Sequence, residues 1–121
     1  MISVVGTRKG KASPEGRVLI PRKMREERTF YVDSFEVGID LYPFSNLSEE
    51  DLKRLADSRV LLDNQNRVNL SAYCNRYDIK GRNIFLMGMG NLIHIVTSED
   101  YIEHKFEERS GDKNTFDEVG I

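Results

Sequence analysis

Residues 13–28 read SPEGRVLIPRKMREER, and this stretch holds a turn, a strand and a cluster of positive charge. The proline and glycine of SPEG favour a type I turn. Residues 18–20 are three aliphatic side chains, too few for a helix, and Pro21 keeps the residue before it extended. The sequence therefore predicts a tight turn, a strand that starts at residue 18, and about two helical turns over residues 21–28.

The same order of signals returns in residues 63–78, which read DNQNRVNLSAYCNRYD. Two pairs of segments match: 16–21 with 66–71 at an offset of 50, and 30–45 with 84–99 at an offset of 54. The second copy therefore carries four extra residues, which we place within RYDIKGR, residues 76–82. An internal repeat of this kind predicts two copies of one structural unit.

The turn of each copy ends on a residue that tolerates a left-handed backbone, Gly16 in the first and Asn66 in the second. Gly and Asn adopt this conformation more readily than other residues. Both turns are therefore expected to be left-handed just before an arginine. Met24 and Cys74 occupy equivalent places after the turns and are expected in the core.

Each copy continues with a hairpin and a helix. The expected strands are residues 29–34 and 38–43 in the first copy, and 83–88 and 91–96 in the second. We interpret the glycines of GMGN, residues 88–91, as hairpin residues, because a phosphate-binding loop needs a wider glycine pattern and a following helix. Ser48 and Ser98 are the expected N-caps of the closing helices.

Half a unit of this size cannot bury its own apolar face, whereas two halves can by placing their strands in one closed sheet. The predicted fold is therefore mainly β (α+β): a barrel of two pseudo-symmetric halves with short helices. We expect one domain over residues 1–107, with halves at about 1–56 and 57–107. Residues 108–121 are expected to form a flexible acidic tail.

Composition narrows the class of protein. The chain has 121 residues, of which 39% are hydrophobic and 31% charged, as in a folded globular domain. No apolar run is long enough to cross a bilayer, and the single cysteine fits a reducing cytosol. No zinc spacing, nucleophile–base pair or paired carboxylates stand out, so we expect no catalysis and no metal, cofactor or small-molecule substrate.

The net charge of −2 conceals an uneven distribution. Residues 1–28 contain eight Lys and Arg against three Glu, which gives +5, so the remaining 93 residues carry −7. Nucleic-acid binding responds to local potential rather than to the total charge. The cluster is therefore compatible with a nucleic-acid site, whereas the usual interpretation of such a cluster is a solvated basic face without a ligand.

These residues resemble the MraZ family, bacterial regulators of the division and cell-wall gene cluster within the AbrB-like group of swapped-hairpin proteins. The resemblance rests on two copies of a turn, an arginine, an aliphatic strand and a short helix, and it spans roughly residues 1–106. The family's Asp-x-x-x-Arg signature is complete at Asp63 and Arg67, whereas Ser13 precedes Arg17. In the second half Ser71 and Asn75 replace an expected proline and arginine.

The resemblance implies sequence-specific binding of double-stranded DNA at a promoter, by a cytoplasmic, nucleoid-associated protein assembled as a homo-oligomeric ring. Arginine suits this task because its guanidinium grips a guanine edge or a phosphate with two hydrogen bonds. The candidate DNA-binding residues are Arg8, Lys9, Lys11, Arg17, Arg22, Lys23, Arg25 and Arg67. Both Arg17 and Arg67 have a second interpretation, structural pairing with carboxylates such as Asp63 that locks their turns.

Two other functions remain open at this point. One is an AbrB-like antitoxin or transition-state regulator whose barrel also binds a protein partner. The other is a scaffold that has kept the barrel and lost DNA binding, which the missing signature residues favour.

Overall fold

The structure, a computed structural model, describes residues 2–102 and is mainly β. The strands are β1 (Val4–Lys11), β2 (Arg17–Leu19), β3 (Thr29–Phe35), β4 (Gly38–Pro43), β5 (Arg59–Leu61), β6 (Arg67–Asn69), β7 (Asn83–Gly90) and β8 (Ile93–Thr97). The short helices are η1 (Arg22–Met24), η2 (Phe44–Asn46), α1 (Glu49–Arg54), η3 (Ala56–Ser58) and η4 (Ser71–Tyr73). Residues 98–102 are also helical. The expected tail lies outside the described residues.

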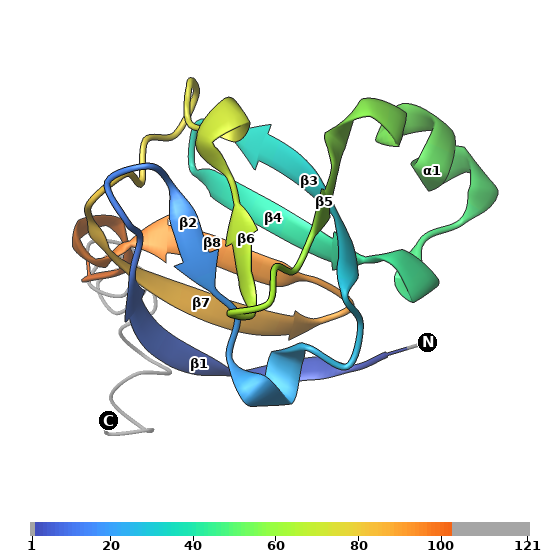
Figure 1. Cartoon of the computed structure of the whole chain (residues 1–121), viewed down its shortest axis with the longest axis horizontal. Helices are drawn as coiled ribbons and strands as arrows, with labels where there is room; N and C mark the ends of the chain where they lie inside the picture. The colour runs from blue at the N-terminus through green and yellow to red at the C-terminus, as the bar shows by residue number, and fades with distance from the viewer. Residues whose placement is uncertain (1, 103–121) are drawn as a thin grey trace, which may run out of the picture.

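The two halves exchange their first strands. Six strands form one antiparallel sheet in the order β1-β7-β8-β4-β3-β5, so β1 of the first half pairs with β7 of the second, and β5 of the second pairs with β3 of the first. The remaining strands, β2 and β6, form a separate two-stranded ribbon that lies across this sheet (Figure 1). We expected all strands in one closed sheet. Instead, a six-stranded sheet and a two-stranded ribbon together enclose the core.

A pseudo-twofold axis relates the halves, as the register of the strands shows. Val18 of β2 pairs with Val68 of β6, and these residues differ by the offset of 50. Asp40 of β4 pairs with His94 of β8, and these differ by the offset of 54. Because each pair joins a residue to its own repeat equivalent, the axis passes through both pairs.

A single hydrophobic core lies between the ribbon and the sheet. It draws buried residues from both halves, and Val18 and Val68 of the ribbon belong to it. Met24 and Cys74 are buried at equivalent places, as expected. Both halves therefore share one hydrophobic core among the described residues.

The expected turns and hairpins are confirmed. Gly16 has φ +96° and Asn66 has φ 63°, so both turns are left-handed at the residue before the arginine. The four strands expected for the two hairpins are β3, β4, β7 and β8. Ser48 caps α1 in a capping box with Asp51.

The helix expected over residues 21–28 was wrong. Only Arg22–Met24 form a helical turn, of the 3-10 type, and Pro21 before it has an extended ψ of 148°. Arg28 already accepts a hydrogen bond at its carbonyl from the Leu62 N–H at 2.9 Å, and β3 begins one residue later. Pairing with the other half therefore overrides the local helical signal.

The second copy confirms the insertion and corrects a cap. The Arg82 carbonyl accepts from the Ala12 N–H at 3.0 Å, which makes Arg82 the equivalent of Arg28 and places the four extra residues between η4 and Arg82. Ser98 does not cap the last helix, because the Thr97 hydroxyl accepts from the Asp100 N–H at 3.3 Å. The helix begins at Ser98, so its N-cap is Thr97 rather than the expected Ser98.

The described residues include no helix that is long and apolar enough to span a bilayer.

Gly88 tests the contact between β1 and β7. A Cβ at Gly88 would lie 2.6–2.7 Å from backbone atoms of Val4 and Val5, whereas a Cβ at Gly10 would meet only side chains, at 3.4 Å and beyond. We expect Gly88→Ala to lower the free energy of unfolding by about 2 kcal/mol, because backbone cannot move aside as a side chain can. Gly10→Ala is the matched control. Equal urea midpoints for the two variants would contradict this packing.

Candidate nucleic-acid interface

The two turns that precede the arginines are built by the same hydrogen bonds. In the first, the Ser13 hydroxyl accepts from the Arg17 N–H at 2.9 Å, and the Ser13 N–H donates to the Arg17 carbonyl at 2.9 Å. In the second, a carboxylate oxygen of Asp63 accepts from the Arg67 N–H at 2.9 Å, and the Asp63 N–H donates to the Arg67 carbonyl at 2.9 Å. A side-chain oxygen at the first turn position thus fixes each arginine backbone.

The ribbon turns these arginines away from the core. Side chains alternate along a strand, so the burial of Val18 and Val68 directs their neighbours outward. Arg17 pairs with Asn69, and Leu19, which is 57% exposed, pairs with Arg67. Arg17, Leu19, Arg67 and Asn69 therefore form the outer surface of the ribbon, which we call the ribbon face. The two arginines lie diagonally across it.

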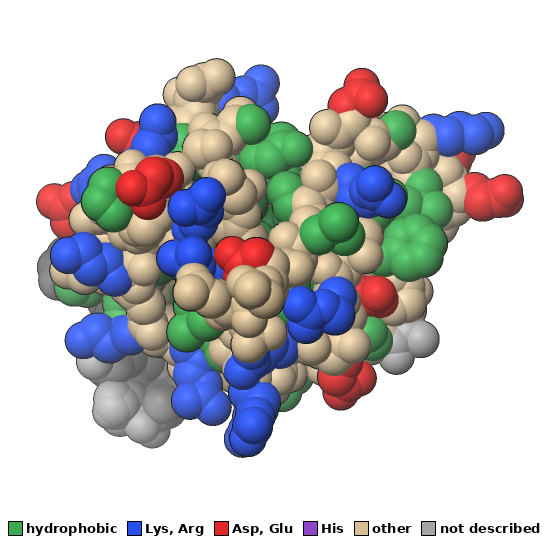
Figure 2. Space-filling view, viewed as in Figure 1, with side chains coloured by type: hydrophobic (Ala, Val, Ile, Leu, Met, Phe, Trp, Pro, Cys, Tyr) green, Lys and Arg blue, Asp and Glu red, His purple; other side chains and the backbone are tan. Residues whose placement is uncertain are grey.

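Further basic residues surround the ribbon face. The exposed side chains of Arg22 and Lys23 lie on η1, where buried Met24 anchors the turn. Figure 2 shows Lys and Arg side chains gathered over the ribbon and the region of η1, with a few acidic side chains between them. Arg25 follows η1 directly and is half-buried.

Strand β1 divides its three basic residues between two faces. Arg8 lies on the same face of β1 as Val4 and Gly10. This face is the core side of the sheet, because Val4 is buried and a Cβ at Gly10 would meet Leu86 and Ile84, and η1 packs against β1 there. Lys9 and Lys11 therefore point to the opposite side. The predicted DNA-binding residues of β1 therefore lie on both faces of the sheet, because spacing in the sequence does not distinguish the two faces of an edge strand.

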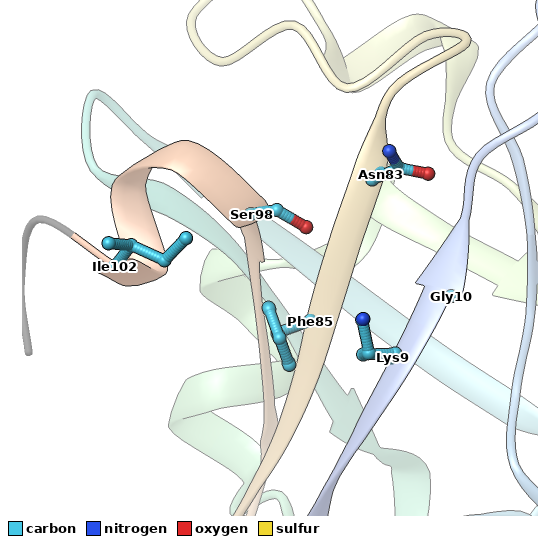
Figure 3. A pocket seen from close by; sticks show the side chains of 6 residues that line it. All are labelled: Lys9, Gly10, Asn83, Phe85, Ser98 and Ile102. Atoms are coloured by element: carbon cyan, nitrogen blue, oxygen red, sulfur yellow. The ribbon is translucent and has the colours of Figure 1, made fainter.

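Lys9 lies beside a separate hollow on that opposite side. The hollow has a volume of about 310 Å³ and is lined by Lys9, Gly10, Asn83, Phe85, Ser98 and Ile102. Figure 3 shows the Lys9 side chain alongside β7, on the same side as Phe85. Lys9 is thus positioned away from the ribbon face.

Asp63 lies in the turn before β6, next to the ribbon face, and holds Arg67. One carboxylate oxygen is 3.5 Å from Arg67 Nε, an ion pair without a hydrogen bond. The pKa of Asp63 is lowered, chiefly by the hydrogen bond from the Arg67 backbone N–H, then by that from the Gln65 N–H and by the charges of Arg67 and Arg17. The structural pairing of Arg67 with Asp63 is thus confirmed, and Arg17 is near enough to act on the same carboxylate.

Two basic residues next to the turns were missed at the sequence level. Arg28 donates to the carbonyls of Leu62 and Asp63, at 3.4 and 3.0 Å, and so supports the second turn. Lys80 lies against the first turn, with its Cγ 3.5 Å from the place of a Cβ at Gly16. Lys80 belongs to the segment with the four extra residues, so the repeat offered no equivalent that pointed to it.

Other polar clusters lie elsewhere. On the pseudo-twofold axis, His94 Nδ1 is 2.5 Å from an Asp40 carboxylate oxygen, on the sheet side away from the ribbon. Within residues 2–102 no group of three His, Cys, Asp or Glu could hold a metal ion.

No protein-family profile matches the chain, and no curated protein matches it either.

The lowered pKa of Asp63 gives a pH-dependent contribution to stability. Because the carboxylate gains hydrogen bonds on folding, it stabilises the fold above the pKa of the unfolded chain, and this stabilisation is lost as the pH falls through the lowered pKa, below about pH 4. In Arg67→Ala the backbone N–H remains, so we expect the Asp63 pKa to rise only in part.

Carboxyl ¹³C NMR titration measures this directly. Arg54→Ala is the control, since Arg54 pairs with Asp33 and Asp51 rather than with Asp63. An Asp63 pKa at its ordinary value in the wild type would contradict the geometry of the second turn.

Proposed function

We propose that this protein is a sequence-specific DNA-binding regulator of transcription. The observation that carries the proposal is the ribbon face: a two-stranded antiparallel ribbon with two outward arginines at the end of a rigid turn. The major groove of B-DNA admits a two-stranded β-ribbon. A ribbon that inserts there brings Arg17 and Arg67 to base edges.

The chemistry of the ribbon face suits base reading. Arginine recognises guanine with two hydrogen bonds, asparagine recognises adenine, and an apolar side chain contacts the thymine methyl group. Arg17, Asn69 and Leu19 supply one of each type. The surrounding cations, Arg8, Arg22, Lys23, Arg25 and Lys80, then serve as phosphate contacts, which position the protein without reading sequence.

The resemblance to the MraZ family extends the proposal. It implies a target in the promoter of a division and cell-wall gene cluster, a nucleoid-associated location, and a homo-oligomeric ring. Linked copies would engage successive DNA repeats, and linkage raises avidity by roughly 10²–10⁴ without new contacts. This compensates for the modest charge of +5 in residues 1–28 of each subunit.

Replacement of Arg17 tests the proposal. We expect Arg17→Ala to weaken binding to a duplex from upstream of the protein's own gene roughly 10- to 100-fold, the effect of losing one bidentate base contact. Lys53→Ala is the control, because Lys53 is exposed on α1, apart from the ribbon (Figure 1), and loses the same charge. Fluorescence anisotropy at two salt concentrations gives both affinities.

The outcome separates a regulator from a scaffold. Wild-type binding that is no tighter than that of Arg17→Ala, with no response to salt, would falsify the DNA-binding proposal. A scaffold that has lost DNA binding would then fit the structure better.

Two adjacent residues of β1 give a second test. Arg8 points to the side of the ribbon and Lys9 to the opposite side. We expect Arg8→Ala to reduce the slope of log K against log salt by about 0.9, the release of one phosphate contact, and Lys9→Ala to leave it unchanged. Equal changes for both variants would mean that β1 does not face DNA in this orientation.

A further inference from the structure

The two turns of the ribbon face differ in one chemically important position. Their backbone hydrogen bonds match residue for residue, and both use a side-chain oxygen 2.9 Å from the arginine N–H. In the first turn that oxygen belongs to the neutral Ser13, and in the second to the charged Asp63. The pseudo-twofold symmetry of the backbone is therefore not a symmetry of charge.

This difference gives the two arginines different surroundings. Arg67 has a counter-ion, because its Nε is 3.5 Å from Asp63. Arg17 forms no ion pair with any described residue and, like Arg67, is half-buried. Arg17 is consequently the arginine without a counter-ion in direct contact, and its charge acts on Asp63 only from a distance.

The carboxylate of Asp63 is held in place. One of its oxygens accepts from the Gln65 N–H at 2.8 Å and from the Arg67 N–H at 2.9 Å, so the group cannot swing out toward solvent without losing both bonds. A fixed carboxylate repels phosphate within a Debye length, about 8 Å at physiological salt. It can still accept a hydrogen bond from a base amino group in the major groove.

We propose that Asp63 is a specificity-determining residue. Its carboxylate repels phosphates from the second turn, while the first turn, with Ser13, supplies affinity. The inference rests on the proposed DNA binding and adds a division of labour between the halves. One subunit then recognises an asymmetric DNA element, despite its pseudo-symmetric backbone. Removal of the carboxylate makes the protein bind DNA more tightly and less selectively.

Reciprocal substitutions test this division, since serine and aspartate make the same hydrogen bond to the arginine N–H in their respective turns. The probes are a duplex from upstream of the protein's own gene and a random duplex of equal length. We expect Asp63→Ser to bind the random duplex about tenfold more tightly, with a salt slope larger by about one, and to prefer its own site less. Ser13→Asp should show the opposite changes in affinity and slope.

The controls distinguish the effect of the position of the carboxylate on DNA binding from effects of net charge and of altered folding. Asp57→Ser removes one exposed carboxylate of η3 and should leave binding unchanged. Asp63→Asn keeps an oxygen for the turn and should behave as Asp63→Ser does, even if the shorter serine loosens the fold. Urea unfolding of each variant monitors the fold.

The outcomes also distinguish the two proposals. If the wild type binds neither duplex, the proposed function itself fails. If the wild type binds its own site but Asp63→Ser, Asp63→Asn and Ser13→Asp leave slope and selectivity unchanged, the DNA-binding proposal stands and the role of Asp63 is wrong. An effect of Asp57→Ser equal to that of Asp63→Ser would overturn it in the same way.

Discussion

The antiparallel pairing of β2 with β6 is the constraint on which the rest of the structure depends. It joins the two halves over only three residue pairs and places Val18 and Val68 in the common core. Because side chains alternate, burial of these valines forces their neighbours outward. One short ribbon therefore completes the core and forms the basic outer surface. A one-residue slip in its register would bury the arginines and expose the valines.

The turns before the ribbon make this pairing possible. Each turn needs a left-handed residue and a side-chain oxygen that holds the arginine N–H, and the two halves meet these needs with different residues. The shared backbone geometry preserves the fold, while the choice of serine or aspartate changes the local charge. Structure and electrostatics are thus separable at one position, and the proposed division of labour between the halves uses this separation.

Charge is also separated within the molecule. Several basic residues surround the ribbon face of a chain whose net charge is −2, while α1 opens with Glu49, Glu50 and Asp51. A localised potential of this kind attracts a polyanion to one face and disfavours contact elsewhere. The low total charge is therefore compatible with a nucleic-acid partner.

The sequence predicted the features that repeat and missed those that depend on long-range pairing. The left-handed turns followed from Gly16 and Asn66, because few other residues tolerate that conformation. The hairpin strands followed from their apolar patterns. The exchange of β1 and β5 between halves has no local signal, and its hydrogen bond to Arg28 shortened the helix expected over residues 21–28. Of the candidate site, the place of Arg17 and Arg67 was predictable, whereas the opposite directions of Arg8 and Lys9 required the strand's register.

The most direct test of the account is an NMR titration of the isotope-labelled protein with a DNA duplex. We predict that the largest shift changes fall on the backbone amides of both turns and of β2 and β6, and on the Nε–H groups of Arg17 and Arg67. The far side of the sheet around Asp40 and His94 should remain unperturbed. Changes centred on α1 or on that far side, with the ribbon unaffected, would contradict the claim that the ribbon meets DNA.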